Sequence, residues 1–482
     1  MAGELIRFDD KHISVEQMQM SVDRILQCYI RNMTGPPSPL IEDYLREAGF
    51  WHVAMIGRGC KLDLKLISAL IERWRRETHT FHLPCGECTI TLEDVALQLG
   101  LLVDGDAVTG SVHSGDWGAV CYELLGAILD NVNGCRIEMG WLRDTFLEPD
   151  DDSTELEKIR YARAYILQII GGYLMPDLSR NLVHLRWLLK LIDFRAAGEF
   201  SWGSAMLATL YREMCGATRP NKVKIGGCLS LLQSWARFCF PFFTSSSGPP
   251  IYIPTHNEFQ WTPYEDPAIR AIIPDEYLQN PNDWHVKVPL VNFAIVEMHQ
   301  SDRVLRQFGF RQPIPVAPEV LDDHHKIELR QLHTDWPRFW SHYIQMWEDR
   351  YDYISTREPT IIPELASVPE CMPWFRIHGK PYLLSEEERQ RQLRVQRERR
   401  GPLNPRRRDD DAGPSTTPTQ SPGPATGPTQ SSGPIVQPST PTVQPLQMMP
   451  GSRRTRDRWR GRRGALLFTN PHHLMGFKHL RH

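Results

Sequence analysis

The sequence lacks the features that carry a chain into or across a membrane. Its longest apolar stretch, residues 165–175, is interrupted by Gln168 and Gly171 and is too short to span a bilayer. The first ten residues, MAGELIRFDD, carry acidic side chains where a secretion signal needs a basic and then an apolar segment. We therefore expect an intracellular protein without membrane contact.

The chain also lacks a strong charge of one sign and a high density of cysteine. Its 55 Lys and Arg residues nearly balance 58 Asp and Glu residues, so the net charge is −3. Such a chain has no global attraction to nucleic acid or lipid, and any such contact must come from local charge. Ten cysteines scattered over 482 residues fit free thiols in a reducing compartment, the cytosol or the nucleus.

Complete catalytic motifs are missing as well. There is no G-x-x-x-x-G-K-[ST] phosphate loop, no H-E-x-x-H metal motif and no Gly-Asp-x-x-Asp-Arg-Gly block. The Gly115-Asp116 pair stands without the further ligands that a two-metal phosphatase needs. Lys222 and Lys224 precede a glycine pair but lack the partners of a pyridoxal phosphate lysine. We expect no enzymatic reaction, no cofactor and no bound metal.

The residues that are present predict a folded, mainly α-helical protein. Hydrophobic residues make up 41% of the chain, which includes 14 Trp, and this is the composition of a globular protein. Apolar residues recur with helical spacing in most of the chain. We predict a multi-helix globular domain with small β-hairpins, and the expected helices cover residues 15–30, 41–48, 62–76, 92–99, 117–129, 138–147, 154–170, 181–192, 204–215, 228–238, 291–299, 302–308 and 336–350.

The most densely specified stretch is residues 81–110, which we call the signature unit. Two β-prone pieces, residues 81–83 and 89–91, flank a segment of turn composition. An apolar stripe then predicts a helix over 92–99. Thr91 suits its N-cap, with Asp94 in the first turn, and Gly100 suits the residue after its last turn.

Cys85 and Cys88 form a C-x-x-C pair in this unit, and His79 and His82 precede them. These residue types at this spacing could hold zinc or run redox chemistry. No second C-x-x-C and no thioredoxin-like strand–helix–strand pattern accompanies them. We favour the interpretation that Cys85 packs as a small apolar side chain.

Three further patterns also have a functional and a structural interpretation. Asp94, Asp104 and Asp106 could belong to a transposase-like acidic triad, but helix-end charge and turn chemistry explain them better. The helix 92–99 has the position of a winged-helix recognition helix, yet its acidic face would repel phosphate. Aromatic residues at helical spacing are more typical of a core or an interface than of a base-stacking platform, and they are Trp336, Phe339, Trp340, Tyr343 and Trp347.

The C-terminal residues 385–482 have a different composition. Residues 385–400 predict a charged helix, and residues 401–451 are a Pro-, Ser- and Thr-rich segment that predicts disorder. An arginine-rich run follows, which could contact nucleic acid weakly or bind a nuclear import receptor. The residues proposed for that contact are Arg453, Arg454, Arg456, Arg458, Trp459, Arg460, Arg462 and Arg463.

The signature unit closely resembles that of the plant mobile domain family, which is also called aminotransferase-like or maintenance-of-meristems-like. The matching motifs are HLPCGE at residues 82–87, TITLEDV at 89–95 and VDG at 103–105. Similar blocks continue along residues 40–350, at 161–167, 184–188, 201–205, 225–235 and 302–309. Cys88 departs from the pattern, because other residues such as Met are usual at that position.

The resemblance implies three parts: an N-terminal leader (1–39), a plant mobile domain (40–384) and the charged helix with its disordered basic tail (385–482). The family is shared by transposable elements and by host genes linked to transposon silencing and meristem maintenance. The resemblance further implies that the chain is a non-enzymatic nuclear interaction module, with protein partners of a phosphatase or chromatin type. A nucleic-acid-binding protein of transposon origin and a cryptic metal-dependent hydrolase are the alternatives.

Overall fold

The computed structural model describes residues 25–378, apart from gaps at 29, 31–32, 34, 58–59, 112–115, 128–134, 177–178, 180, 220, 241–258, 320 and 322–334. Most of the predicted leader and the whole of the predicted tail, residues 385–482, lie outside the described residues. The arginine-rich run 453–463 is therefore not described either, and its proposed contacts stay predictions.

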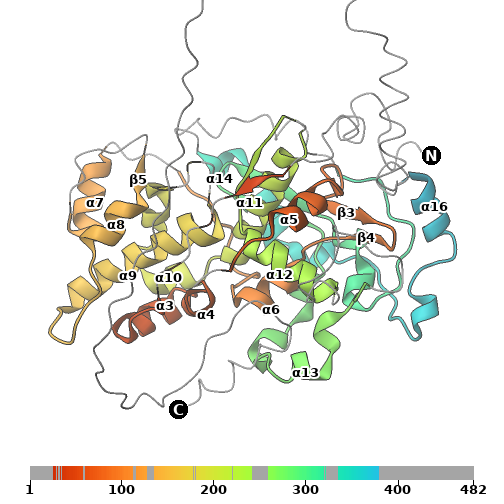
Figure 1. The fold of residues 1–482 in the computed structure, drawn as a ribbon, viewed down its shortest axis with the longest axis horizontal. Coiled ribbons are helices and arrows are strands. Elements are labelled where there is room, and N and C mark those ends of the chain that lie inside the picture. Colours follow the sequence, from red (N-terminus) through yellow and green to blue (C-terminus); the bar gives the residue numbers. More distant parts are fainter. Residues whose placement is uncertain are drawn as a thin grey trace, which may run out of the picture. The chain divides into compact units, whose positions relative to one another are not determined.

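The described region is mainly α-helical, as the sequence predicts, with four small sheets (Figure 1). Its α-helices are α3 (Glu42–Glu47), α4 (Trp51–Ile56), α5 (Leu64–Ile71), α6 (Leu92–Leu99), α7 (Trp117–Leu125), α8 (Met139–Thr145), α9 (Glu155–Ile169), α10 (Phe194–Gly198), α11 (Trp202–Ala217), α12 (Leu229–Cys239), α13 (Pro267–Arg270), α14 (Trp336–Phe339), α15 (Ser341–Glu348) and α16 (Cys371–His378). The strands are β1 (Gln27–Cys28), β2 (Trp74–Arg75), β3 (Thr80–Leu83), β4 (Gly86–Cys88), β5 (Arg136–Glu138), β6 (Leu182–His184), β7 (Lys224–Ile225), β8 (Val288–Asn292) and β9 (Ile295–His299).

Helix α11 is the element on which the core is assembled. It packs against the hairpin β8–β9, against α6 and against β2 and β7. Its buried side chains include Trp202, Tyr211 and Met214. In Figure 1, α7, α8 and α9 lie together on one side of α11, and β3 and β4 lie on the other.

The signature unit folds nearly as its sequence predicts. Helix α6 has the predicted ends, because Thr91 and Asp94 form a reciprocal capping box and Gly100 takes a left-handed conformation with φ of 61°. The preceding hairpin exists, but its second strand is β4 and begins at Gly86, so the turn is shorter than predicted. Phe81 pairs with Cys88 in this hairpin.

Two predicted helices are wrong, those over 291–299 and 181–192. The segment 291–299 runs from the end of β8 through β9. The helix predicted over 62–76 is present as α5, but it ends at Ile71, before β2. The segment 181–192 is strand β6 followed by the 3₁₀ helix η3 (Leu185–Lys190). Both strands of β8–β9 are buried throughout, and a continuous apolar run carries no period that separates a strand from a helix.

The other predicted helices are present with shifted ends or in shorter pieces. Residues 302–308 form two 3₁₀ turns, η8 (Ser301–Arg303) and η9 (Leu305–Phe308), and residues 336–350 form α14 and α15. The end of the helix predicted over 15–30 is wrong, because Gln27 and Cys28 form a strand that pairs with β7. The remaining short turns are η1 (Pro39–Ile41), the π-helical η2 (Ile170–Leu174), η5 (Pro263–Glu265), η6 (Asp275–Leu278), η7 (Pro281–Trp284), η11 (Arg350–Tyr353) and η12 (Pro363–Leu365).

The helices of the described region are all too short or too polar to cross a bilayer.

The two capping boxes found in the described region give a matched test of how burial affects cap strength. Thr91 at α6 is 1% exposed, whereas the box of Thr154 at α9 lies in an exposed setting. Replacing Thr91 with alanine removes the hydroxyl that donates to the buried Asp94 carboxylate and that accepts from the Asp94 N–H at the helix end. We expect Thr91→Ala to lower the free energy of unfolding by about 1–2 kcal/mol and Thr154→Ala by about 0.5 kcal/mol. Urea denaturation measures both, and equal losses would contradict this ranking.

Candidate functional site

The C-x-x-C cysteines do not form a metal or redox site with the histidines that precede them. Cys85 and Cys88 are buried free thiols. Burial raises the pKa of Cys85 to about 12 and holds the pKa of Cys88 well above its usual range. A thiol that holds its proton so firmly is a poor nucleophile and redox group. The structure therefore supports the packing interpretation of Cys85, and the two histidines belong to different polar clusters.

His82 belongs to a cluster centred on the carboxylate of Glu87. Arg303 donates two hydrogen bonds to Glu87, from Nε at 2.8 Å and from Nη2 at 2.7 Å. Thr80 Oγ1 donates a third bond at 2.9 Å, and His82 Nε2 lies 3.7 Å from the same carboxylate oxygen. Arg303 is 1% exposed and Glu87 is 8% exposed, so this is a buried, bidentate ion pair.

The charges of this cluster set the protonation of its members. Burial opposes the charge on Glu87, but the Arg303 guanidinium outweighs burial and holds the pKa of the carboxyl well below its usual range. Burial lowers the pKa of His82 to about 4, and the nearby Arg75 guanidinium acts in the same direction. At neutral pH the cluster therefore contains a carboxylate, a guanidinium and a neutral imidazole.

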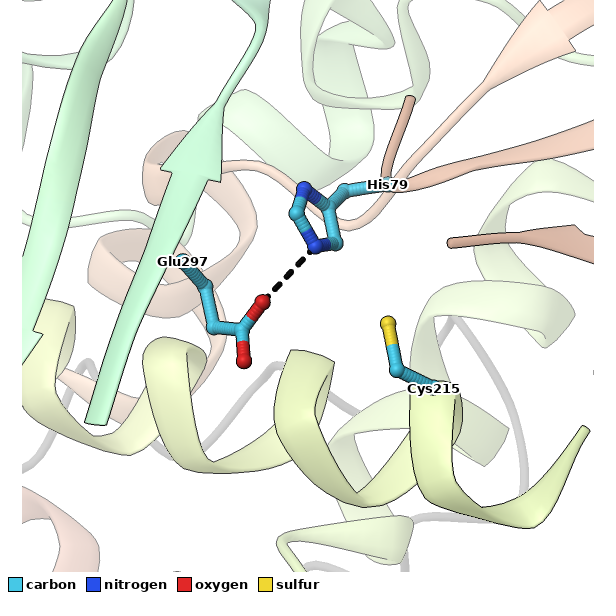
Figure 2. Close-up of side chains that lie close together, drawn as sticks. All are labelled: His79, Cys215 and Glu297. Atoms are coloured by element: carbon cyan, nitrogen blue, oxygen red, sulfur yellow. Dashed lines mark ion pairs between the residues drawn. The ribbon is translucent and has the colours of Figure 1, made fainter. Parts of the chain in front are cut away.

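His79 belongs to a second cluster, centred on the carboxylate of Glu297 (Figure 2). His79 Nε2 lies 2.8 Å from Glu297 Oε2, and Arg212 Nε lies 2.6 Å from Glu297 Oε1. Figure 2 shows Cys215 on α11 with its sulfur directed toward the same space, while Glu297 comes from β9 and His79 from the turn before β3. Donor atoms of His79, Cys215 and Glu297 all lie within 4.8 Å of one another.

The backbone and the aromatic neighbours fix the His79 ring in this cluster. His79 has a φ of 50°, which is uncommon for a residue with a side chain. Thr89 Oγ1 donates a hydrogen bond to the His79 carbonyl at 2.7 Å. The ring of Tyr211 stacks on the imidazole at 5.3 Å between centroids. Because both the backbone of His79 and the face of its ring are held, the imidazole keeps one orientation and can act as a fixed hydrogen-bond donor.

The cluster is closed to substrates. The exposed fractions of His79, Cys215 and Glu297 are 3%, 2% and 0%. Burial lowers the pKa of His79, but Cys215 and Glu297 outweigh this effect and raise it to about 10. A cysteine, a histidine and a carboxylate could in principle form a nucleophilic triad, but here no substrate can reach the sulfur. Within the described residues, this is the one group of His, Cys and acidic side chains arranged to hold a metal ion.

The acidic residues that sequence patterns brought together have separate structural roles. Asp94 caps α6 and accepts a hydrogen bond from Tyr264 at 2.7 Å, and burial raises its pKa to about 6. The carbonyl of Asp104 accepts a bond from Arg350, and the Asp106 backbone bridges to Phe200. The winged-helix hypothesis is wrong for α6, because its residues are buried except for the half-exposed Glu93.

The remaining candidates also have roles in the fold. Asp116 is the N-cap of α7, Lys224 lies in β7, and the Gly226 amide donates to Glu213. The core interpretation of the aromatic stripe is confirmed for its three tryptophans, which are at most 2% exposed, whereas Phe339 is 54% exposed. The tryptophans are Trp336, Trp340 and Trp347.

A cavity of about 420 Å³ lies between α3, α4, the end of α6 and the segment 276–284. Its wall includes His52 and Tyr277, which share a 2.6 Å hydrogen bond, and the indole of Trp284. Sequence patterns did not predict this cavity, because its walls come from segments far apart in the chain.

The family model of the plant mobile domain matches residues 49–247 and 253–376, which is more than half of the chain. The chain belongs to the plant mobile domain family. The resemblance found in the signature unit is thereby confirmed, and it extends over nearly the whole described region.

Three proteins of Arabidopsis thaliana illustrate the similarity. The protein MAINTENANCE OF MERISTEMS is 33% identical over 357 residues, which cover 66% of this chain and 73% of that protein. The protein MAIN-LIKE 1 is 38% identical over 340 residues, which cover 64% of this chain and 65% of that protein. A serine/threonine-protein phosphatase 7 long form homolog is 35% identical over 385 residues, which cover 71% of this chain but only 28% of that protein. No solved structure matches this chain.

Sequence reasoning missed four residues of the two clusters, which are Arg303, Arg212, Cys215 and Glu297. They lie far in sequence from His79, His82 and Glu87, and no spacing rule connects them with these residues. His79, His82 and Glu87 were visible in the sequence, but their partners were not.

The low pKa of His82 predicts a component of acid unfolding. Its ring stays neutral in the folded protein down to about pH 4, whereas in the unfolded chain it binds a proton below about pH 6.5. The unfolded state therefore gains one proton over this range, and stability falls as pH falls. As the pH is lowered from 6.5 to 4, the unfolding equilibrium constant should rise more steeply for the wild type than for His82→Gln. We expect a difference of up to about tenfold for each pH unit.

Denaturant titrations at several pH values measure this difference. His342→Gln, at an exposed position of α15, is the control and should keep the wild-type slope. A slope for His82→Gln equal to that of the wild type would show that His82 is protonated in the fold.

Proposed function

We propose that this chain is a non-enzymatic nuclear interaction module, which acts in transcriptional regulation, transposon silencing and meristem maintenance. Its similarity to the protein MAINTENANCE OF MERISTEMS over 73% of that protein carries the proposal. The partners we propose are proteins of a phosphatase or chromatin type, and the arginine-rich run 453–463 would add a weak contact with nucleic acid.

The use of the charged residues in the fold supports a binding role over a catalytic one. Glu87, Arg303, Glu297 and Arg212 satisfy one another inside the protein. Charges paired in this way inside the protein are not offered to a substrate. The phosphatase named above shares only 28% of its length with this chain, so its name supports a phosphatase as a proposed partner more than a phosphatase activity here.

One exposed segment offers an apolar surface for such a partner. Ile361, Ile362 and Leu365 are 87%, 47% and 49% exposed. The flanking backbone is fixed, because Phe310 bridges to Pro359 and the backbone N–H of Gln312 donates to the Ala366 carbonyl. Exposed apolar side chains on a fixed backbone are typical of protein-binding surfaces.

Affinity purification from plant nuclei with mass spectrometry tests this proposal. We expect the full chain and a 1–384 truncation to recover the same chromatin or phosphatase-type partner, because the proposed module lies within 40–384. The double variant Ile361→Asp/Leu365→Asp should lose this partner, since two carboxylates at an apolar contact cannot be desolvated cheaply.

The control is Leu147→Asp, which changes another side chain that is 76% exposed and should keep the partner. Recovery of partners by the full chain alone would move the function to the tail, and absence of the protein from nuclei would refute the proposal. Hydrolysis of a phosphate ester by the purified chain would refute its non-enzymatic part.

A further inference from the structure

We propose that His79, Cys215 and Glu297 form a buried structural zinc site. An imidazole nitrogen, a thiol sulfur and a carboxylate oxygen are the three donor types that Zn²⁺ takes from proteins. They come from three elements, the turn before β3, helix α11 and strand β9. A metal at this point would join the signature unit to the two elements that form the centre of the core.

The distances suit a small metal ion after a slight adjustment. Two donors on one tetrahedral zinc lie about 3.3–3.6 Å apart, given bonds of about 2.0 Å to nitrogen or oxygen and about 2.3 Å to sulfur. The present donor atoms lie within 4.8 Å of one another. His79 Nε2 and Glu297 Oε2, 2.8 Å apart, would separate slightly, and the sulfur would move toward them.

Two of the donor residues, Cys215 and Glu297, have the kind of outer partner that metal ligands have in proteins. The Trp74 indole Nε1 donates a hydrogen bond to Cys215 Sγ at 3.3 Å. The Arg212 guanidinium holds Glu297 Oε1 at 2.6 Å, while Oε2 faces His79. Thr89 holds the backbone of His79. Such outer contacts orient the ligands and stabilise the charged forms that bind the metal.

The site would be structural and not catalytic. Three protein ligands with a water in the fourth position are also the ligand set of catalytic zinc sites, but here burial closes that fourth position to a substrate. The rings of Trp74 and Tyr211 lie against the His79 ring at 6.1 and 5.3 Å between centroids, and all three ligands are at most 3% exposed. A metal enclosed in this way stabilises the fold but offers no open position to a substrate.

The first test is the zinc content of the full chain, purified after expression in zinc-supplemented medium and dialysed against a chelator. We expect about one zinc per chain by mass spectrometry of the metal, and we expect Cys215→Ser to retain almost none. The matched control, Cys239→Ser, changes a buried cysteine of α12 and should keep one zinc per chain. Zinc that is absent from the wild type, or equal in Cys215→Ser, would overturn the proposal.

A second measurement decides the matter if Cys215→Ser fails to fold. The full-length wild type is unfolded in denaturant and refolded with Co²⁺, which takes the place of zinc and reports its ligands by absorption. We expect one Co²⁺ per chain with a sulfur-to-cobalt charge-transfer band and the strong visible bands of a tetrahedral ion. Refolded protein without the charge-transfer band would show that no thiolate binds the metal, and would refute the site.

Discussion

The buried ion pair between Glu87 and Arg303 is the interaction on which the signature unit depends. A carboxylate and a guanidinium with almost no exposure to solvent are costly to bury, and only good geometry with further hydrogen bonds compensates for the cost. Both conditions are met here, because the pair is bidentate and Thr80 adds a third bond. Nearby, the Gln307 amide both donates to and accepts from the backbone of Thr89. These contacts connect the hairpin β3–β4 to the segment 303–307.

The need to pair buried charges explains why the motif HLPCGE at residues 82–87 contains His82 and Glu87, two residue types that are common in active sites. Glu87 and His82 point into the protein, where the fold determines their protonation. Glu297 repeats the arrangement at the other end of the hairpin, with His79 and Arg212 as its partners. Buried carboxylates thus hold both the hairpin β3–β4 and the turn that precedes it. Among the described residues, exposed apolar side chains are left on the surface, for example Ile361 and Leu365.

Local chemistry made much of the fold predictable from the sequence. The ends of α6 and the start of α9 depend on residues within one turn of the helix end. These ends could therefore be predicted from Thr91, Gly100 and Thr154. The hairpin β8–β9 was missed, because both of its faces are buried and its apolar run has no period. The two buried clusters were also missed. Their partners lie far apart in sequence, and no spacing rule connects Glu87 with Arg303 or His79 with Glu297.

A double-mutant cycle on Glu87 and Arg303 tests most directly whether these charges serve the fold. The free energy of unfolding is measured at pH 7 for the wild type, Glu87→Gln, Arg303→Gln and the double variant. We expect each single change to cost about 3–5 kcal/mol, because it leaves a buried charge without its partner. The double variant should cost clearly less than the sum of the two single changes. Additive costs, or a Glu87→Gln variant as stable as the wild type, would contradict a structural role for this pair.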